Sequence, residues 1–323
     1  MAIEVKRGAK MHVRKLVKAG RASHTISLPK SWLDKNQLKK GDTIFIQEKS
    51  DAELVLRTSQ DDEKQEQKEI TIEVDNKSIG SIQREITSAY VNNYSKINLA
   101  GKSISQQSKK LRDVIHHFVA LEVDEQTSSK ISAKDLLNLN EISIEKTIRR
   151  MDMTLRSIMQ DTAAAISGKK IEESIEQRDN DVNRLYFLLF RLLKGALNSQ
   201  KIAQNFKITN NDILSIWYLT VNVENIADNT KTISKLVDKI NDKELLKDVC
   251  ADILQAYTDV MKAYYNKNKQ IADEVASRRI DIFTKSTKLL IKTPTAGAAE
   301  VIENLKDMTT NICNIARIVL DAE

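Results

Sequence analysis

The spacing of apolar residues changes along the chain, and the first pattern covers residues 12–57. Two short β-branched runs, "HVRKLV" and "HTISLP", are followed by a second pair, "TIFIQEK" and "AELVLRT". Between the pairs, Pro29 begins "PKSWLDKNQL", and proline fits the first turn of a helix. The pattern predicts the order β-β-α-β-β. Because so short a segment has little core of its own, we expect it to gain stability by pairing with a second copy.

A strongly polar stretch separates this segment from the next pattern. Residues 59–69 contain no apolar side chain, which is typical of a linker and sets the first domain at 1–58. Beyond the linker, two strand–helix pairs and a hairpin predict a compact βαβαββ unit over residues 70–138. Strands are expected at 69–74 and 96–101 and within the hairpin 120–136, and helices at 78–94 and 105–118.

The remaining residues, 139–323, have apolar positions three and four residues apart, which is the helical period. The expected helices are 141–166, 170–198, 209–240, 242–268, 270–291 and 297–321. Their length and short connections favour an antiparallel bundle. On the last helix the apolar stripe consists of Ile302, Leu305, Thr309, Ile312, Ala316 and Val319, and on the third it includes Ile216, Val223, Ala227 and Val237. The fold class is therefore multidomain and mainly α.

Composition supports the helical reading and sets the expected compartment. The chain of 323 residues has only 8 Gly and 2 Pro. Cys250 and Cys313 lie in helical sequence without metal-ligand spacing, so we interpret both as small buried residues in a reducing compartment. No stretch reaches the ~18 apolar residues that a membrane helix needs, and the first residues lack an apolar leader. We therefore expect a cytoplasmic, soluble protein.

Positive charge is concentrated at the beginning of the chain. Residues 1–50 contain 12 Lys and Arg against 4 Asp and Glu, although the net charge of the whole chain is only +6. The cations near the first hairpin are Arg14, Lys15, Lys18, Arg21 and Lys30. Cations on a β-ribbon can neutralise phosphates and reach into a major groove. On charge alone, however, a solvated charged face is the favoured interpretation.

The residues around this hairpin resemble a known family. "RKLVKAGRASHTISLPKSW" followed by "LKKGD" is similar to the AbrB/SpoVT swapped-hairpin DNA-binding domain, in a longer form with extra residues between Gly20 and Pro29. The resemblance implies an intertwined homodimer whose basic loops face DNA. Arg14 and Arg21 match the DNA-contacting arginines of the family, and Lys15, Lys18 and Lys30 are expected to contact phosphates. His24 matches no role in the family, and a lone histidine is more often packed or solvated.

One carboxylate motif occurs twice in the helical half. "ENIAD" begins at Glu224 and "ENLKD" at Glu303, 79 residues later. Because residues i and i+4 share a helix face, Glu224 projects with Asp228, and Glu303 with Asp307. Such pairs can share a hard cation or iron, but helices also carry many exposed acids. Counted on a helical wheel, both pairs lie away from the apolar stripes. Each motif falls on the third helix of a set of three, so we infer an internal duplication.

The duplicated motifs resemble those of PhoU proteins, which carry two three-helix repeats with acidic i, i+4 pairs. The repeats would cover about 141–240 and 242–323 here, and the resemblance implies a divalent metal or iron at Glu224, Asp228, Glu303, Asp307 and Asp179. The second-helix motif departs from the family, with Asn183 where an Asp is favoured and Ala272 and Ala276 in the second repeat.

The order of the domains also resembles a family, the archaeal PhoU-like phosphate uptake regulators. That resemblance implies a DNA-binding transcriptional regulator of phosphate homeostasis. The alternatives are an adaptor that docks a phosphate transporter or a sensor kinase, and a metal-binding or polyphosphate-storage protein without specific DNA binding. The expected partners are therefore DNA, a second copy of the chain, and transport or signalling proteins.

Catalysis has little support in the sequence. The four histidines form no nucleophile or metal-ligand pattern, and there is no Gly-rich phosphate loop and no Gly-x-Ser-x-Gly. His116 and His117 end an amphipathic helix, where cations suit the helix dipole. The sequence predicts no catalytic residues, and we expect that the protein is not an enzyme.

Overall fold

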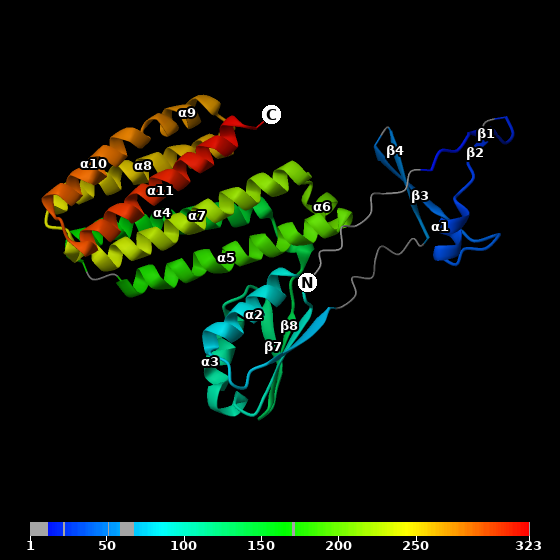
Figure 1. Cartoon of the computed structure of the whole chain (residues 1–323), viewed down its shortest axis with the longest axis horizontal. Helices are drawn as coiled ribbons and strands as arrows, with labels where there is room; N and C mark the ends of the chain where they lie inside the picture. Colours follow the sequence, from blue (N-terminus) through cyan, green and yellow to red (C-terminus); the bar gives the residue numbers. More distant parts are fainter. Residues whose placement is uncertain (1–11, 22, 51, 59–67, 170–171, 323) are drawn as a thin grey trace. The chain divides into compact units, whose positions relative to one another are not determined.

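The chain divides into two compact units, residues 1–66 and 67–323, and each is described by itself. The computed structural model, shown in Figure 1, describes residues 12–21, 23–50, 52–58, 68–169 and 172–322. Most of the expected linker, residues 59–67, lies outside the described residues. In the described part of the chain, no helix is long and apolar enough to cross a membrane.

The N-terminal unit has two hairpins around one short helix, which confirms the predicted β-β-α-β-β order. The elements are β1 (Val17–Lys18), β2 (His24–Thr25), α1 (Lys30–Lys35), β3 (Phe45–Ser50) and β4 (Glu53–Arg57). The strands pair antiparallel, β1 with β2 and β3 with β4, in two separate sheets. Gly20, with φ of 96°, forms the β1–β2 turn in the left-handed region that favours glycine. The first two strands are much shorter than the predicted runs.

In 12–58, none of the residues whose burial the structure describes is buried. Large apolar side chains on both hairpins and the segment before β1 are exposed, namely Val13, Leu16, Val17, Ile26, Ile46 and Leu54. A sheet of two strands offers no second layer against which these side chains could pack. Within the described residues, the single chain therefore gives this unit no buried apolar core.

Residues 68–138 form a four-stranded sheet with two helices, as the sequence predicts. The elements are β5 (Glu69–Glu73), α2 (Ile79–Val91), β6 (Lys96–Ala100), α3 (Ile104–His116), β7 (Leu121–Gln126) and β8 (Lys130–Asp135). The strand order is β5-β6-β8-β7, in which β5 and β6 are parallel and the other pairs are antiparallel. Buried residues of the sheet, such as Ile97 and Ile131, pack with Ile82 and Leu111 of the helices in one core.

Asp75 joins the parallel strands to helix α3. It follows β5, and its carboxylate accepts hydrogen bonds from the backbone N–H groups of Lys102 and Ser103, each at 2.9 Å. These bonds hold the pKa of Asp75 below its ordinary value. Gly101, with φ of 154°, lies beside this carboxylate, and a Cβ there would meet Asp75 Oδ1 at 2.7 Å. The turn therefore requires glycine both for its backbone angle and for space.

The helical half is a bundle of long helices (Figure 1). Its helices are α4 (Ile144–Ile166), α5 (Glu172–Asn198), α6 (Gln200–Phe206), α7 (Asn210–Leu236), α8 (Lys243–Asn266), α9 (Lys269–Ser277), α10 (Arg279–Lys292) and α11 (Ala296–Leu320), with single 3-10 turns at Leu139–Glu141 and Val237–Lys239. The six predicted helices are present with two differences. A short helix, α6, lies between the second and third, and the predicted fifth helix is broken at Arg278 into α9 and α10.

The predicted apolar stripes form the bundle core. Every residue of the stripe on α11 is buried, and so are Ile216, Val223, Ala227 and Val237. The third helices of the two repeats, α7 and α11, pack against each other. In both copies of the repeated motif the threonine is buried and donates to the carbonyl four residues earlier, Thr230 to Ile226 at 2.6 Å and Thr309 to Leu305 at 2.8 Å. This match supports duplication of a three-helix repeat.

The α/β part and the bundle form one unit because α5 packs against both. Phe187 and Phe190 of α5 pack on the core of the α/β part. Arg191, also on α5 and 4% exposed, pairs with Asp135 and lies 4.7 Å from the ring centre of Tyr90. The sequence left the role of residues 70–138 open, and the structure shows them attached to the bundle by a buried ion pair and aromatic contacts.

Candidate functional site

The five cations predicted to contact DNA are all exposed. Lys18 lies in β1 opposite His24 of β2, Arg21 follows the turn at Gly20, and Lys30 begins α1. Arg14 and Lys15 precede β1, and Arg14 donates to the carbonyl of Val13 at 2.9 Å. Among the described residues, none of the five pairs with a carboxylate. Their charges are therefore available to an anionic partner.

The carboxylates of the first repeat come together between α5 and α7. Asp179 of α5 is 2% exposed, and Lys231 of α7 places its Nζ 2.5 Å from Asp179 Oδ2. The same ammonium lies 2.7 Å from Oδ1 of Asp228. Asn183 donates a long hydrogen bond of 3.4 Å to Asp179. One lysine therefore bridges two carboxylates from two helices.

Burial and charge change the pKa values in this carboxylate cluster. Burial raises the pKa of Asp179, and the hydrogen bond from Lys231 opposes that rise. Burial, followed by the nearby charges of Asp228 and Asp179, raises the pKa of Glu224 to about 7. Burial alone lowers the pKa of Lys231, but its bonds to Asp179 and Asp228 raise it overall. The cluster thus holds a firmly charged lysine and a glutamate that titrates near neutral pH.

The arrangement does not suit a metal ion as the side chains stand. The Lys231 ammonium lies at the position between Asp179 and Asp228 that a bound cation would take. Over the described ranges, no group of three or more His, Cys, Asp or Glu side chains has a geometry that could hold a metal. The first repeat therefore neutralises its acids with a residue of its own, and metal binding there stays a prediction.

The second copy of the motif is arranged differently. Glu303 and Asp307 are both exposed on α11, as the wheel predicts. Thr310 stands where the first copy has Lys231, and the buried Ala272 stands where it has Asp179. The first pair differs from the wheel's expectation, since Glu224 and Asp228 are half-buried. A helical wheel considers the residues of α7 alone. In the structure, polar side chains of α5 such as Asp179 pack beside these acids and cover part of them.

Sequence reasoning missed two features of the helical half. It did not assign Lys231, although Asp228 three residues earlier is the spacing of a helical ion pair. It also did not identify a groove between α10 and α11 lined by Arg279, Lys288 and Lys306, because their arrangement with apolar neighbours depends on how two helices pack.

Comparison with known proteins finds a similar family for the N-terminal segment. Residues 18–64 match the family described as "Antidote-toxin recognition MazE, bacterial antitoxin". The N-terminal segment is of the MazE/AbrB type. This match covers both hairpins and the helix from Lys18 onward, and it confirms the resemblance found from the sequence. No curated protein matches the chain.

Among solved structures, the chain is similar to one described as the crystal structure of the phosphate transport system regulatory protein PhoU from Streptococcus pneumoniae. The alignment covers 55% of this chain and 92% of that chain, with 16% identity and a TM-score of 0.43.

Proposed function

We propose that the protein is a DNA-binding transcriptional regulator that acts as a dimer through residues 12–58. The observation that carries the proposal is the state of this unit, in which apolar and cationic side chains are exposed together. It is supported by the match of residues 18–64 to the MazE family. The helical half would receive a signal or a partner and pass its effect to the DNA-binding unit.

The exposed apolar side chains of the N-terminal unit support the proposed dimer. Val17 and Ile26 are 58% and 57% exposed, and Ile46 and Leu54 are each 64% exposed. An apolar side chain contributes about 1.5–3 kcal/mol when it is fully buried, and exposed chains forgo that stabilisation. A second copy that exchanges hairpins with the first would cover these residues. It would also double the number of cations presented to one DNA duplex.

DNA is the partner that best fits the charges. Arg14, Lys15, Lys18 and Arg21 lie before, within and just after β1, and no carboxylate among the described residues neutralises them. A β-ribbon fits the major groove of DNA, where arginine can contact both phosphates and guanine and lysine contacts phosphates. The finer proposal is that the target promoters control phosphate uptake, as the resemblance to PhoU-like regulators implies.

Binding to fluorescent promoter fragments of phosphate-transport genes tests this function. The test variant is Arg14→Ala with Arg21→Ala, and the matched control is Lys109→Ala with Lys110→Ala, which removes two exposed cations from α3. We expect the test variant to lose affinity at least about tenfold, because two charges are lost from each protomer and four from the dimer, and the control to bind like the unaltered chain. Equal binding by all three proteins would contradict the proposed interface.

The same preparation distinguishes the adaptor alternative. If the unaltered protein binds no promoter fragment but co-purifies with a phosphate-transport ATPase, the helical half acts as an adaptor and the N-terminal unit serves dimerisation alone. Sedimentation velocity separates these cases further, because both need a dimer while only the regulator adds a DNA-bound species.

A further inference from the structure

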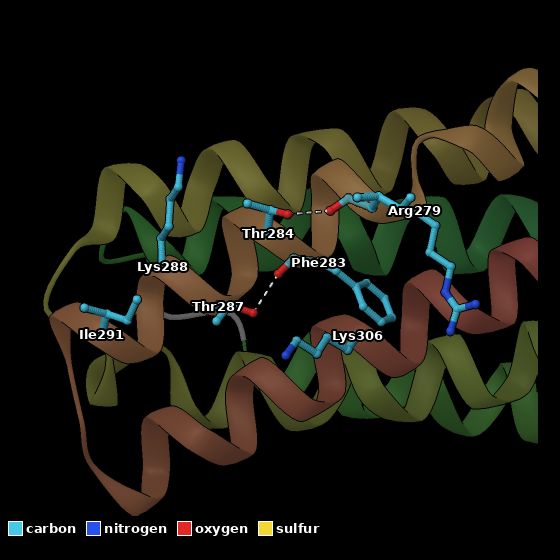
Figure 2. Close-up of a pocket in the computed structure, with 8 residues that line it drawn as sticks. Arg279, Phe283, Thr284, Thr287, Lys288, Ile291 and Lys306 are labelled. Atoms are coloured by element: carbon cyan, nitrogen blue, oxygen red, sulfur yellow. Dashed lines mark hydrogen bonds between the residues drawn. The ribbon is translucent and has the colours of Figure 1, made fainter.

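An open groove of about 680 Å³ lies between α10 and α11 in the second repeat. Figure 2 shows residues from both helices around it. They are Arg279, Ile280, Phe283, Thr284, Thr287, Lys288 and Ile291 of α10, and Lys306 of α11. All of them belong to the unit 67–323, so an inference about the groove does not depend on DNA binding by the N-terminal unit.

Besides its core face, helix α10 has a second stripe of mainly apolar residues at the surface of the bundle. Its core face consists of Ile282, Ser286 and Leu289, which are buried. Ile280, Phe283, Thr287 and Ile291 follow one another at spacings of three, four and four residues on a different face. Ile280 and Ile291 are each 75% exposed, more than any other large apolar side chain described in 68–322. That spacing is the one with which a helix contacts another helix.

Three cations surround this stripe without a carboxylate partner among the described residues. Arg279 lies 4.9 Å from the centre of the Phe283 ring, and Lys306 lies 5.8 Å from it. Lys306 lies on the other side of the groove from Lys288 (Figure 2). Neighbouring cations do have partners, since Lys285 pairs with Asp252 at 2.5 Å and Arg278 with Asp259 at 2.7 Å. The groove therefore combines an apolar floor with unneutralised positive charge.

The threonines of the groove do not offer hydroxyl donors to a ligand. Thr284 donates to the carbonyl of Ile280 at 2.8 Å, and Thr287 donates to that of Phe283 at 2.9 Å (Figure 2). With these hydroxyls engaged, a small anion such as phosphate would meet only flexible side-chain cations around an apolar surface. An elongated ligand with apolar side chains along its centre and carboxylates at its edges fits the groove better.

We propose that the α10–α11 groove binds an acidic amphipathic helix of a partner protein. From Ile280 to Ile291 the stripe extends about 16 Å at the helical rise of 1.5 Å per residue, which is three turns of a bound helix. Leucine-like residues of the partner would pack on Ile280, Phe283 and Ile291. Its flanking carboxylates would pair with Lys288 and Lys306, so that charge selects the partner and apolar contact holds it.

A designed pair of peptides tests the proposal with the full chain. Each peptide has about 18 residues, which is long enough to be partly helical in water. Its leucines follow one another at alternating spacings of three and four residues, so that they share one helix face. One carries glutamate on both flanks and the other carries lysine at the same places. We expect the acidic peptide to bind, and Lys288→Glu with Lys306→Glu to weaken it at least about tenfold, because each reversal replaces attraction by repulsion. Lys109→Glu with Lys110→Glu is the matched control and is expected to leave binding unchanged.

Ile280→Ser with Ile291→Ser provides a second variant that should retain the fold, because both side chains are 75% exposed. It is expected to weaken the acidic peptide as well, with an unchanged circular dichroism spectrum. The proposal is overturned if both peptides bind equally, if neither binds, or if the groove variants bind like the control. It is also overturned if the chain ignores the peptides but sediments with phosphatidylglycerol vesicles through Ile280 and Ile291, because the surface would then serve a membrane.

Discussion

Replacing Lys231 by methionine is the sharpest perturbation of the carboxylate cluster. The change retains much of the side-chain length but removes the ammonium that lies 2.5 Å from Asp179, a residue only 2% exposed. Breaking a buried ion pair costs about 3–5 kcal/mol when one charge is left behind. Lys231 itself is 24% exposed and Asn183 retains a weak contact, so we expect a loss of about 2–3 kcal/mol.

Lys235→Met is the matched control, one helical turn further along α7. Lys235 pairs with Glu176 at 3.6 Å, but both side chains are at least half exposed, so its loss should cost less than about 1 kcal/mol. Urea unfolding of the full chain at neutral pH, followed by helical circular dichroism, measures both values. Adding Asp179→Asn should recover most of the loss in the Lys231 variant. Equal effects of the two lysines, or no recovery, would refute the reasoning.

Three further predictions concern the unit 67–323. Burial holds the pKa of Glu224 at about 7, above its ordinary value of 4.5, so the folded state loses stability as the pH rises from 4.5 to 7 and the group takes its charge. Glu224→Gln should therefore raise the free energy of unfolding by about 1–2 kcal/mol at pH 8, after allowance for partial exposure, and change little at pH 4.5; an equal gain at both values would contradict this. Arg191→Met should leave Asp135 without its partner and lower protection from hydrogen exchange in α2 and α5, with unaltered exchange counting against the proposed attachment. Gly101→Ala should lower stability by about 2 kcal/mol or more because its Cβ would meet Asp75, whereas Gly168→Ala, with open space around it, should cost about 1 kcal/mol from its backbone angle alone; similar melting temperatures would show that the turn relaxes freely.

The sequence was sufficient to predict the helical architecture because each long helix repeats its apolar spacing over several turns. On α11 each of the six predicted core positions is buried, and the repeated motif places a buried threonine on both α7 and α11. A single break such as the one at Arg278 was not predictable in this way, since no proline or glycine marks it. The shortness of β1 and β2 has a different basis: among the described residues of the single chain these strands pair only with each other, and β-branched runs do not reveal that.

The candidate sites were less predictable because they depend on packing between helices. Spacing alone placed Glu224 and Asp228 on one face, but it could not show that Asp179 of α5 lies beside them or that Lys231 bridges the acids. The wheel treated Glu303 and Asp307 as equivalent to the first pair. In the structure the two copies of the motif differ, because Thr310 and Ala272 occupy the positions in the second repeat that Lys231 and Asp179 occupy in the first.

The salt dependence of promoter binding tests the central claim most directly. If Arg14 and Arg21 of both protomers contact DNA phosphates, four contacts are lost in Arg14→Ala with Arg21→Ala. The slope of log affinity against log salt should then become shallower by about 3–4, while Lys109→Ala with Lys110→Ala leaves it unchanged. A double variant with the slope of the unaltered protein, or an unaltered protein whose DNA affinity does not respond to salt, would contradict the account.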